Sequence, residues 1–271
     1  MSHHKHKTPA TLVEPTTFRL ADLDPDATKP LDKDEAEKRL AKLRPRLAEL
    51  QETLYAEHQQ SLLLVFQAMD TGGKDGAIEK LLTGVNPAGV QVAAFKAPTQ
   101  HELDHDFLWR IHAQTPRRGH IGVFNRSHYE DVLVVRVHGL VSEAECRARY
   151  ADINHFEDLL TRNGTRVIKF YLHISLEEQA QRLRDRLKDP AKRWKFDPND
   201  LKERAHWPVY QAALQDALAA TSTPACPWYV VPANAKWARD LAIMEIVVAA
   251  LEDMNPRPPE ATFDVAAQVI V

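Results

Sequence analysis

Residues 62–76 read Leu-Leu-Leu-Val-Phe-Gln-Ala-Met-Asp-Thr-Gly-Gly-Lys-Asp-Gly, and this segment carries the strongest structural signal in the chain. Its first five residues form a continuous apolar run, which is typical of a short strand covered on both faces. A glycine-rich turn and Lys74 follow, and the next residues are expected to form a helix. This order predicts a phosphate-binding loop, because backbone N–H groups, the positive end of the helix and the lysine would converge on phosphate oxygens.

The loop departs from the pattern G-x-x-x-x-G-K-[ST] in two places. Ala68 replaces the first glycine, and Asp75 replaces the metal-binding Ser or Thr, while a carboxylate, Asp70, lies within the loop. A turn that needs glycine only for its backbone geometry, with Asp70 as a helix cap, is the simpler interpretation. An uncompensated carboxylate repels phosphate, however, so Asp70 indicates either Mg²⁺ bridging or a base for the acceptor phosphate, and we expect metal binding. The predicted phosphate-binding residues of the loop are Thr71, Gly72, Gly73, Lys74, Asp75 and Gly76.

Length and composition are those of an ordinary globular protein. The chain has 271 residues, 44% of them hydrophobic and 27% charged, and a net charge of −3, so no general attraction to nucleic acid is expected. No apolar run is long enough to cross a membrane, and no secretory signal is evident at the start. Cys146 and Cys226 match no metal or redox spacing, which favours a reducing cytoplasm. His3, His4 and His6 could bind metal, but a frayed or artificial terminus is the more ordinary interpretation.

The N-terminal part divides into two segments. Residues 1–33 are rich in Pro, Thr and Asp and predict an arm or loop. Residues 34–57 predict a helical extension, with leucines at 40, 43, 47, 50 and 54 on one face and with Pro45 as a kink or a break. The leucine stripe is compatible with a seam between subunits and equally with packing on the core of the chain.

Strands and helices then alternate, which predicts a parallel, doubly wound sheet in a three-layer α/β/α domain over residues 58–255, followed by a tail at 256–271. Strands are expected at 62–66, 90–95, 121–124, 166–174 and 228–231. Helices are expected at 77–82, 100–113, 142–162 and 239–251, together with a basic helical stretch after the fourth strand. In such a sheet the ligand binds beyond the carboxyl ends of the strands.

The third strand ends in Phe-Asn-Arg-Ser-His-Tyr-Glu-Asp at 124–131. Many P-loop enzymes hold Mg²⁺ with an acidic residue at the end of this strand, but here that position is Asn125. Carboxylates follow at Glu130 and Asp131, and Arg126 would direct its planar donors at the phosphates. A surface charge cluster capping the next helix is the alternative.

The segment 182–207 is rich in Arg and Lys and predicts a lid that closes over a phosphate-rich substrate. Asp189-Pro190 and Asp197-Pro198 interrupt its helices, and two tryptophans would have little reason to lie in a purely solvated run. A solvated helix face is the alternative. The lid candidates for phosphate binding are Arg182, Arg186, Lys192 and Arg193, and weaker candidates elsewhere are Lys96 and Arg110.

Several stretches together resemble the polyphosphate kinase 2 family. They are 68–76, Phe-Lys-Ala-Pro at 95–98, His-Asp-Phe-Leu-Trp-Arg at 105–110, 124–131, 189–196 and Pro-Trp-Tyr-Val-Val-Pro-Ala at 227–233. The resemblance implies a thymidylate-kinase-like P-loop fold with a helical lid and an oligomeric assembly, either a dimer or a tetramer. It also implies catalytic roles for Asp70 and Lys74 in the loop, Arg126 after the third strand, and Arg182 and Arg186 on the lid helix.

Asn125, together with Glu130-Asp131, resembles the subgroup called class III, whose members phosphorylate AMP and ADP with polyphosphate as donor. The resemblance implies Mg²⁺, with Mn²⁺ as an alternative, and we place it on Asp70 and Asp131. We therefore expect reversible phosphoryl transfer between inorganic polyphosphate and adenine nucleotides, without a covalent enzyme intermediate. An ATP-dependent nucleoside monophosphate kinase and a non-catalytic polyphosphate- or nucleic-acid-binding module are the alternatives.

Overall fold

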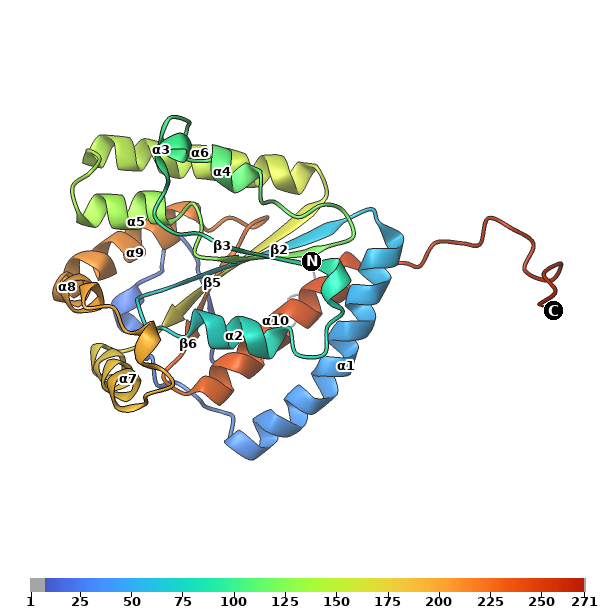
Figure 1. The fold of residues 1–271 in the computed structure, drawn as a ribbon, viewed down its shortest axis with the longest axis horizontal. Coiled ribbons are helices and arrows are strands. Elements are labelled where there is room, and N and C mark those ends of the chain that lie inside the picture. Colours follow the sequence, from blue (N-terminus) through green and yellow to red (C-terminus); the bar gives the residue numbers. More distant parts are fainter. Residues whose placement is uncertain (1–7, 271) are drawn as a thin grey trace.

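A computed structural model describes residues 8–270, so the three N-terminal histidines lie outside the described residues. A six-stranded sheet has the order β1-β6-β5-β2-β4-β3. It runs through the middle of the molecule (Figure 1). The pairs β2–β4, β2–β5, β3–β4 and β5–β6 are parallel, as predicted. The parallel strands are β2 (Ser61–Ala68), β3 (Val90–Ala94), β4 (Ile121–Asn125), β5 (Thr165–His173) and β6 (Trp228–Pro232).

Helices cover both faces of the sheet and complete the predicted three layers (Figure 1). One face packs against α1 (Lys33–Glu57), α2 (Lys74–Leu81) and α10 (Lys236–Met254). The other packs against α5 (Glu130–Val137), α6 (Glu143–Arg162) and α9 (Trp207–Thr221). Shorter elements are η1 (Leu20–Asp22), η2 (Pro87–Gly89), α3 (Gln100–Leu103), α4 (Trp109–His112), α7 (Leu176–Lys188), η3 (Arg193–Lys195) and α8 (Asn199–Ala205).

Strand β2 lies at the centre of the sheet, between β4 and β5. Residues 62–66 are fully buried, which explains the uninterrupted apolar run. From β2 the chain first builds β3 on one side and later β5 on the other. The order of strands therefore reverses at β2, and a crevice for ligands is expected beyond its carboxyl end, where the glycine-rich loop begins.

The helix α1 is continuous through Pro45. The Asp32 side chain caps its start by accepting a hydrogen bond from the Glu35 amide at 2.8 Å. The leucine stripe is buried or partly buried in the same core as α10, so packing within the chain, and not a seam between subunits, accounts for it.

Two helices replace the single helix predicted over 100–113, and that prediction was wrong. The side chain of Asp106 accepts a hydrogen bond from the Leu108 amide at 3.0 Å, and its carbonyl accepts one from the Trp109 amide at 3.1 Å. This local bonding starts a new helix and turns the chain, so that Leu103 stays 60% exposed. The helices α5 and α9 were not among the predicted elements.

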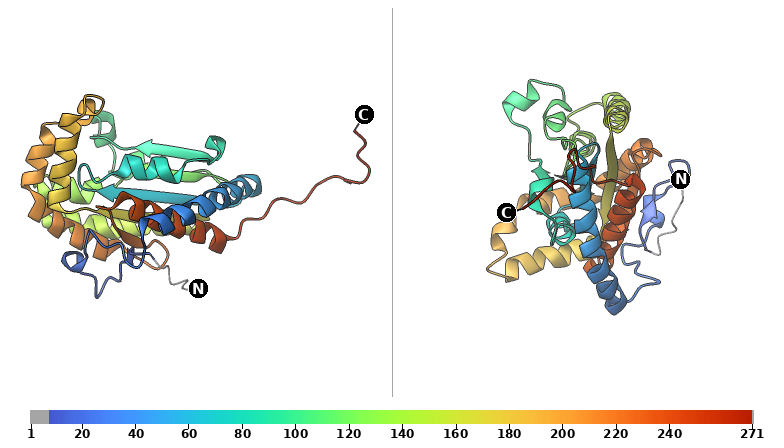
Figure 2. Two further views of the ribbon diagram at one scale, coloured as in Figure 1. Left: turned by 90° about the horizontal axis from the view of Figure 1, so that it is seen from below. Right: turned by 90° about the vertical axis from the view of Figure 1, so that its right-hand side faces the viewer.

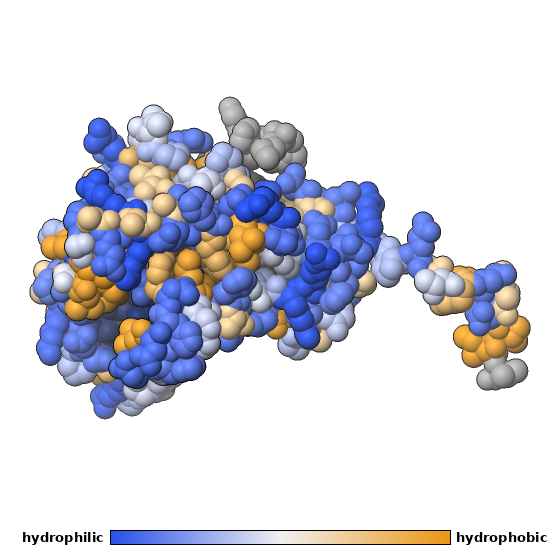
Figure 3. Space-filling view, turned by 90° about the horizontal axis from the view of Figure 1, so that it is seen from above, coloured by the Kyte–Doolittle hydropathy of each residue, from blue (hydrophilic) through white to orange (hydrophobic). Residues whose placement is uncertain are grey.

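The termini differ in how they pack. Residues 8–32 lie against the body: β1 (Thr11–Leu12) pairs antiparallel with β6, and Val13, Phe18 and Leu20 are buried. After α10, residues 255–270 contain no helix or strand and extend away from the body (Figure 2). This extension carries exposed hydrophobic residues of its own, including Phe263 and Ile270 (Figure 3). Across residues 8–270, every helix is too short or too polar to cross a membrane.

Candidate active site

The glycine-rich loop after β2 has alternating backbone handedness. Thr71 and Gly73 have φ values of 61° and 92°, which are left-handed. A Cβ atom on Gly72 would lie 2.4 Å from the Ala68 Cβ, and one on Gly73 would lie 2.5 Å from Nη1 of Arg239. Both positions therefore require glycine, one for space and the other for space and conformation.

The loop presents unpaired amide groups at the start of α2. Among residues 8–270, the amides of Thr71, Gly73, Lys74, Asp75 and Gly76 find no hydrogen-bond acceptor. Successive amides in a turn of alternating handedness form a concave anion site, and the N-terminus of the helix adds positive potential. This geometry suits a bound anion, and phosphate binding by these loop residues stays a prediction.

Lys74 folds back over the loop. Its Nζ donates to the Ala68 carbonyl oxygen at 3.2 Å. Burial, and then the charge of Arg126, lower the pKa of Lys74, although the neighbouring carboxylates oppose this shift. The lysine is thus a cation held close to other cations, and an incoming phosphate would relieve the repulsion between them.

Arg126 and Asp70 face each other across the crevice. Nη2 of Arg126 lies 2.9 Å from Oδ1 of Asp70, and Nη1 lies 3.9 Å from Oε2 of Glu130. The backbone of Arg126 is left-handed, with φ of 63°, and its amide donates to the Phe66 carbonyl at 3.1 Å. Burial would lower the pKa of Arg126, but Glu130 and Asp70 raise it above its ordinary value. Such a strained, well-held residue at a strand end is typical of a functional site.

Asp75 of the loop and Asn125 at the end of β4, both unusual at their positions, bind each other. Nδ2 of Asn125 donates to Oδ1 of Asp75 at 2.7 Å, joining the end of β4 to the first turn of α2. A neutral amide is suited to this contact, whereas an aspartate at position 125 would repel Asp75.

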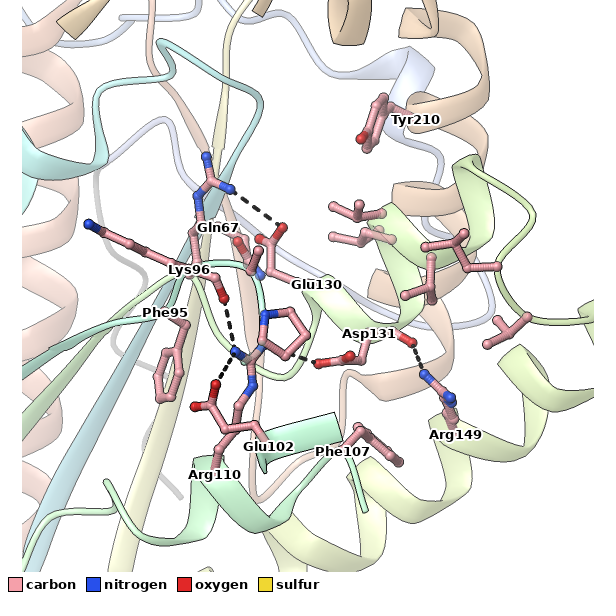
Figure 4. Close-up of a pocket in the computed structure, with 18 of the residues that line it drawn as sticks. Gln67, Phe95, Lys96, Glu102, Phe107, Arg110, Glu130, Asp131, Arg149 and Tyr210 are labelled. Carbon is pink, nitrogen blue, oxygen red and sulfur yellow. Dashed lines mark hydrogen bonds and ion pairs between the residues drawn. The ribbon is translucent and has the colours of Figure 1, made fainter. Parts of the chain in front are cut away.

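A cavity of about 1070 Å³ is lined by Asp70 and Arg126 and by residues of α5 and α6. Figure 4 shows part of its lining, including Glu130 and Asp131 on α5 and Arg149 on α6. Its floor holds the buried Arg110, whose Nη1 donates to the Lys96 carbonyl at 2.9 Å and lies 4.0 Å from Glu102. The apolar wall includes Phe95 and Leu133. The cavity therefore combines charged groups with apolar surface, as a nucleotide site requires.

Asp131 points into this cavity beside Arg110 (Figure 4). Its Oδ2 is buried and finds no hydrogen-bond partner among residues 8–270, and Nη2 of Arg110 lies 3.7 Å away. Burial raises the pKa of Asp131, although the charges of Arg110 and Arg149 act in the opposite direction. The carbonyl oxygen of Asp131 also accepts a hydrogen bond from Arg149 at 3.0 Å.

Asp70 and Asp131 are the predicted metal ligands. Residues 8–270 contain no group of three or more His, Cys, Asp or Glu side chains placed to hold a metal ion. Mg²⁺ in phosphate-transfer sites, however, often takes only one or two carboxylates, with phosphates and water completing its shell. Asp70 and Asp131 line the same cavity and fit such a site, and their joint role in metal binding stays a prediction.

Most of the lid cations predicted to bind phosphate instead bond to other residues of the lid. Arg186 donates to the Lys195 carbonyl at 3.0 Å and lies 3.3 Å from Asp200. Lys192 pairs with Asp189 at 2.8 Å, and Arg193 donates to the Leu187 carbonyl at 2.9 Å. The lid residues that line the cavity are instead Asp197, Asn199, Asp200 and Glu203. In this conformation the structure does not bring Lys192 and Arg193 to the loop.

Arg182 lies behind the loop. Nη1 donates to the Thr71 carbonyl at 3.1 Å, Nη2 to the Ala233 carbonyl at 2.5 Å, and Nε to Glu178 at 2.7 Å. Burial lowers the pKa of Arg182, and the charge of Glu178 opposes the shift. Its direct contact with phosphate, predicted from the sequence, stays a prediction.

Two residues at the loop were missed by the sequence analysis. Arg239 on α10 donates to the Gly73 carbonyl at 3.3 Å, and Gln179 on α7 donates to the Asp70 carbonyl at 3.0 Å. An arginine in the first turn of a largely apolar helix was the one available signal for Arg239. Nothing in the local sequence marks Gln179.

Comparisons with known proteins agree on one family. A family model described as "Polyphosphate kinase 2 (PPK2)" matches residues 30–259. The chain is 50% identical over 245 residues to an AMP/ADP-polyphosphate phosphotransferase of Meiothermus ruber, covering 90% of this chain and 92% of the relative. It is 44% identical to an ADP-polyphosphate phosphotransferase of Rhodopseudomonas palustris, covering 80% and 79%. The crystal structure of polyphosphate kinase 2 from Arthrobacter aurescens TC1 matches with a TM-score of 0.92 and 47% identity, covering 94% of this chain and 92% of that one.

Proposed function

The chain belongs to the polyphosphate kinase 2 family, and on that premise we propose that it transfers phosphoryl groups reversibly between inorganic polyphosphate and AMP or ADP. The observation that carries the proposal is the similarity over nine-tenths of the chain to an AMP/ADP-polyphosphate phosphotransferase. The phosphate loop and the adjoining cavity support it, because they offer a site for a phosphate chain next to a site for a nucleotide.

The reaction needs no covalent enzyme intermediate. An oxygen of the acceptor phosphate forms a bond to the terminal phosphorus of polyphosphate as the bridging P–O bond breaks, and the shortened chain leaves. The transition state is loose, so the protein acts by alignment and by dispersing negative charge. Lys74, Arg126 and the loop amides would bind the transferring group, and Arg186 would join them from the lid.

Asp70 and Asp131 would hold Mg²⁺, for which Mn²⁺ is an alternative. When bound, the ion supplies charge neutralisation and orientation at the phosphate oxygens. The residues of the chain divide the remaining work. Arg126 keeps Asp70 in place through their ion pair at 2.9 Å, and Arg110 lies beside Asp131 at the cavity floor.

A donor and acceptor matrix tests the proposal. Purified protein with Mg²⁺ is given polyphosphate or ATP as donor and AMP or ADP as acceptor, and the nucleotides are resolved by chromatography. We expect ADP and ATP to form from AMP with polyphosphate, and ATP from ADP. Transfer from ATP alone would support a nucleoside monophosphate kinase, and binding of polyphosphate without turnover or Mg²⁺ would support a binding module.

We also propose a cellular location and an oligomeric state for the enzyme. Both cysteines are buried and free, consistent with a cytoplasmic location. A dimer or tetramer is proposed from the resemblance to the family. The stripe on α1 does not contribute to this proposal, because it is buried against α10 within the chain.

A further inference from the structure

The backbone carbonyl groups of the phosphate loop are nearly all occupied. The Ala68 carbonyl accepts from Lys74, and the Met69 carbonyl accepts from the Gly72 amide at 2.9 Å. The carbonyls of 70 and 71 accept from Gln179 and Arg182. The Gly73 carbonyl accepts from the Ala77 amide at 3.0 Å and also from Arg239 at 3.3 Å. A buried carbonyl requires a donor, and in a tight turn the direction of each carbonyl fixes the direction of the next amide. The donors behind the loop therefore direct its amides toward the crevice.

The two arginines behind the loop are deeply buried. Arg239 is 2% exposed, and both Nε and Nη2 bind Oδ1 of Asp240, at 2.8 and 2.6 Å. Its remaining nitrogen, Nη1, reaches the Gly73 carbonyl. Arg182 is fixed in the same way by Glu178 and by Ala233. Each guanidinium thus gives one nitrogen to the loop and its others to a neighbouring carboxylate or backbone carbonyl. Within residues 8–270, all of these hydrogen bonds lie behind the loop.

Gln179 connects the loop to the lid. It is 1% exposed, its Nε2 donates to the Asp70 carbonyl, and its Oε1 accepts from Nη1 of Arg204 at 2.9 Å. Arg204 lies on α8, and it also donates to the Leu176 carbonyl at 2.6 Å. A single amide therefore joins a lid helix to the residue that carries the predicted metal-binding carboxylate.

We propose that Gln179, Arg182 and Arg239 are positioning residues that hold the loop in its polyphosphate-binding shape without touching the substrate. The inference rests on the proposed function, because it assigns the phosphate chain to the loop. For Arg182 it takes the place of the direct phosphate contact that the sequence predicted, and it divides the cations around the loop into two groups. Lys74 and Arg126 face the substrate, whereas Arg182 and Arg239 bind the loop from behind.

The test uses Arg239→Lys, which keeps a cation beside Asp240 but loses the fork that reaches Gly73. Losing one hydrogen bond from a charged donor should weaken polyphosphate binding about tenfold. The KM for AMP should stay unchanged, because the nucleotide occupies the cavity and not the loop. Hydrogen exchange of the peptide spanning 69–76 should speed up in the free enzyme. Binding is measured by calorimetry with polyphosphate of defined length, so that it does not depend on turnover.

Arg39→Lys is the matched control. Arg39 on α1 pairs with Glu245, which lies on α10 as Arg239 does. Within residues 8–270, neither Arg39 nor Glu245 forms a hydrogen bond or ion pair with the loop. This variant should leave the affinity for polyphosphate and the exchange of 69–76 at their wild-type values. Gln179→Met, a substitution of similar size that removes the donor to Asp70, provides a second test should Arg239→Lys not fold.

Two results would overturn the inference. One is wild-type polyphosphate affinity and loop exchange in folded variants at both positions. The other is an equal rise in KM for polyphosphate and for AMP that follows a loss of thermal stability, which would show a general structural role. Absence of any transfer by the wild-type enzyme would instead count against the proposed function, and the binding and exchange measurements would still decide the role of Arg239.

Discussion

Two charged clusters lie on opposite sides of the segment 126–131. On the crevice side, Arg126 pairs with Asp70 and approaches Glu130, and its side chain is 42% exposed. On the core side, Lys169 donates to Glu157 at 2.5 Å, to the Tyr129 hydroxyl at 2.9 Å and to the Thr221 carbonyl at 2.7 Å. In this cluster Lys169 is fully buried and Glu157 nearly so.

The difference lies in what water can do at each cluster. The crevice pair is solvated, so it adds little to stability and can exchange its partners for phosphate. The core cluster has no access to water, so every donor must be bonded and removal of one partner leaves a buried charge. Burial would raise the pKa of Glu157, but the charge of Lys169 lowers it. We therefore expect chemistry from the crevice cluster and stability from the core cluster.

Lys74→Ala should produce the largest effect on activity. Loss of the cation at the loop should lower the rate of transfer at least about 10³-fold, comparable to losing a key charge in other phosphoryl-transfer sites. Stability should hardly change, because Lys74 makes one hydrogen bond to the protein and burial already disfavours its charge. Initial rates and denaturant unfolding measure the two effects. If this variant unfolds as it loses activity, the charges on the crevice side also stabilise the fold, and the contrast with the core cluster is lost.

Lys169→Met should have the opposite profile. It leaves Glu157 buried without its cation, which should cost about 3–5 kcal/mol of unfolding free energy. The double variant Lys169→Met with Glu157→Leu removes both charges and should regain part of that loss. Urea unfolding of the three proteins measures this. An unchanged midpoint for the single variant would show that the core cluster is more hydrated than its burial indicates.

Arg126→Gln changes the crevice cluster itself and should lower activity without lowering stability. The rate should fall about 10²–10³-fold, because a charged donor near the transferring phosphoryl group is lost. The unfolding free energy should change by less than about 1 kcal/mol, as for other solvated ion pairs. Arg166→Gln, which removes a comparable surface arginine 3.7 Å from Asp253 and away from the loop, is the control. A large loss of stability in Arg126→Gln, but not in the control, would show that Arg126 stabilises the fold.

Local sequence was enough to predict the centre of the fold. The buried strand, the Gly72-Gly73 turn and Lys74 are adjacent in the chain, so their chemistry is readable without tertiary structure. The position of Arg126 beside the loop was predictable for a similar reason, since it follows directly after a strand end. Lys169 also leaves a signal, because a lysine within the apolar residues of a fully covered strand must have a buried partner.

Other features depend on contacts that the sequence does not encode locally. Arg239 reaches a carbonyl 166 residues earlier, and no spacing rule connects them. The composition of the lid indicated many cations, but not their direction. The structure shows that Arg186 and Arg193 bind carbonyls within the lid, while Asp200 lines the cavity. The number of charges follows from composition, whereas their orientation follows from packing.

The smallest expected effect is a proton taken up on binding. The pKa of Lys74 is lowered in the free enzyme by burial and then by Arg126, so Lys74 loses its proton at a lower pH than an ordinary lysine. A bound polyanion favours the charged form and raises this pKa again. Affinity for polyphosphate should therefore fall as pH rises through the lowered pKa, and binding in that range should take up a fraction of a proton.

Calorimetry in buffers of different ionisation enthalpy measures that uptake. Lys74→Arg is the matched variant, because arginine stays protonated at every accessible pH and should bind without proton uptake even where it binds more weakly. Arg126 also stays protonated at every accessible pH, so it cannot be the group that takes up the proton. Uptake that persists unchanged in Lys74→Arg would place the titrating group elsewhere, and Asp200, whose pKa is raised by burial and then by Asp70, would be the next group to test.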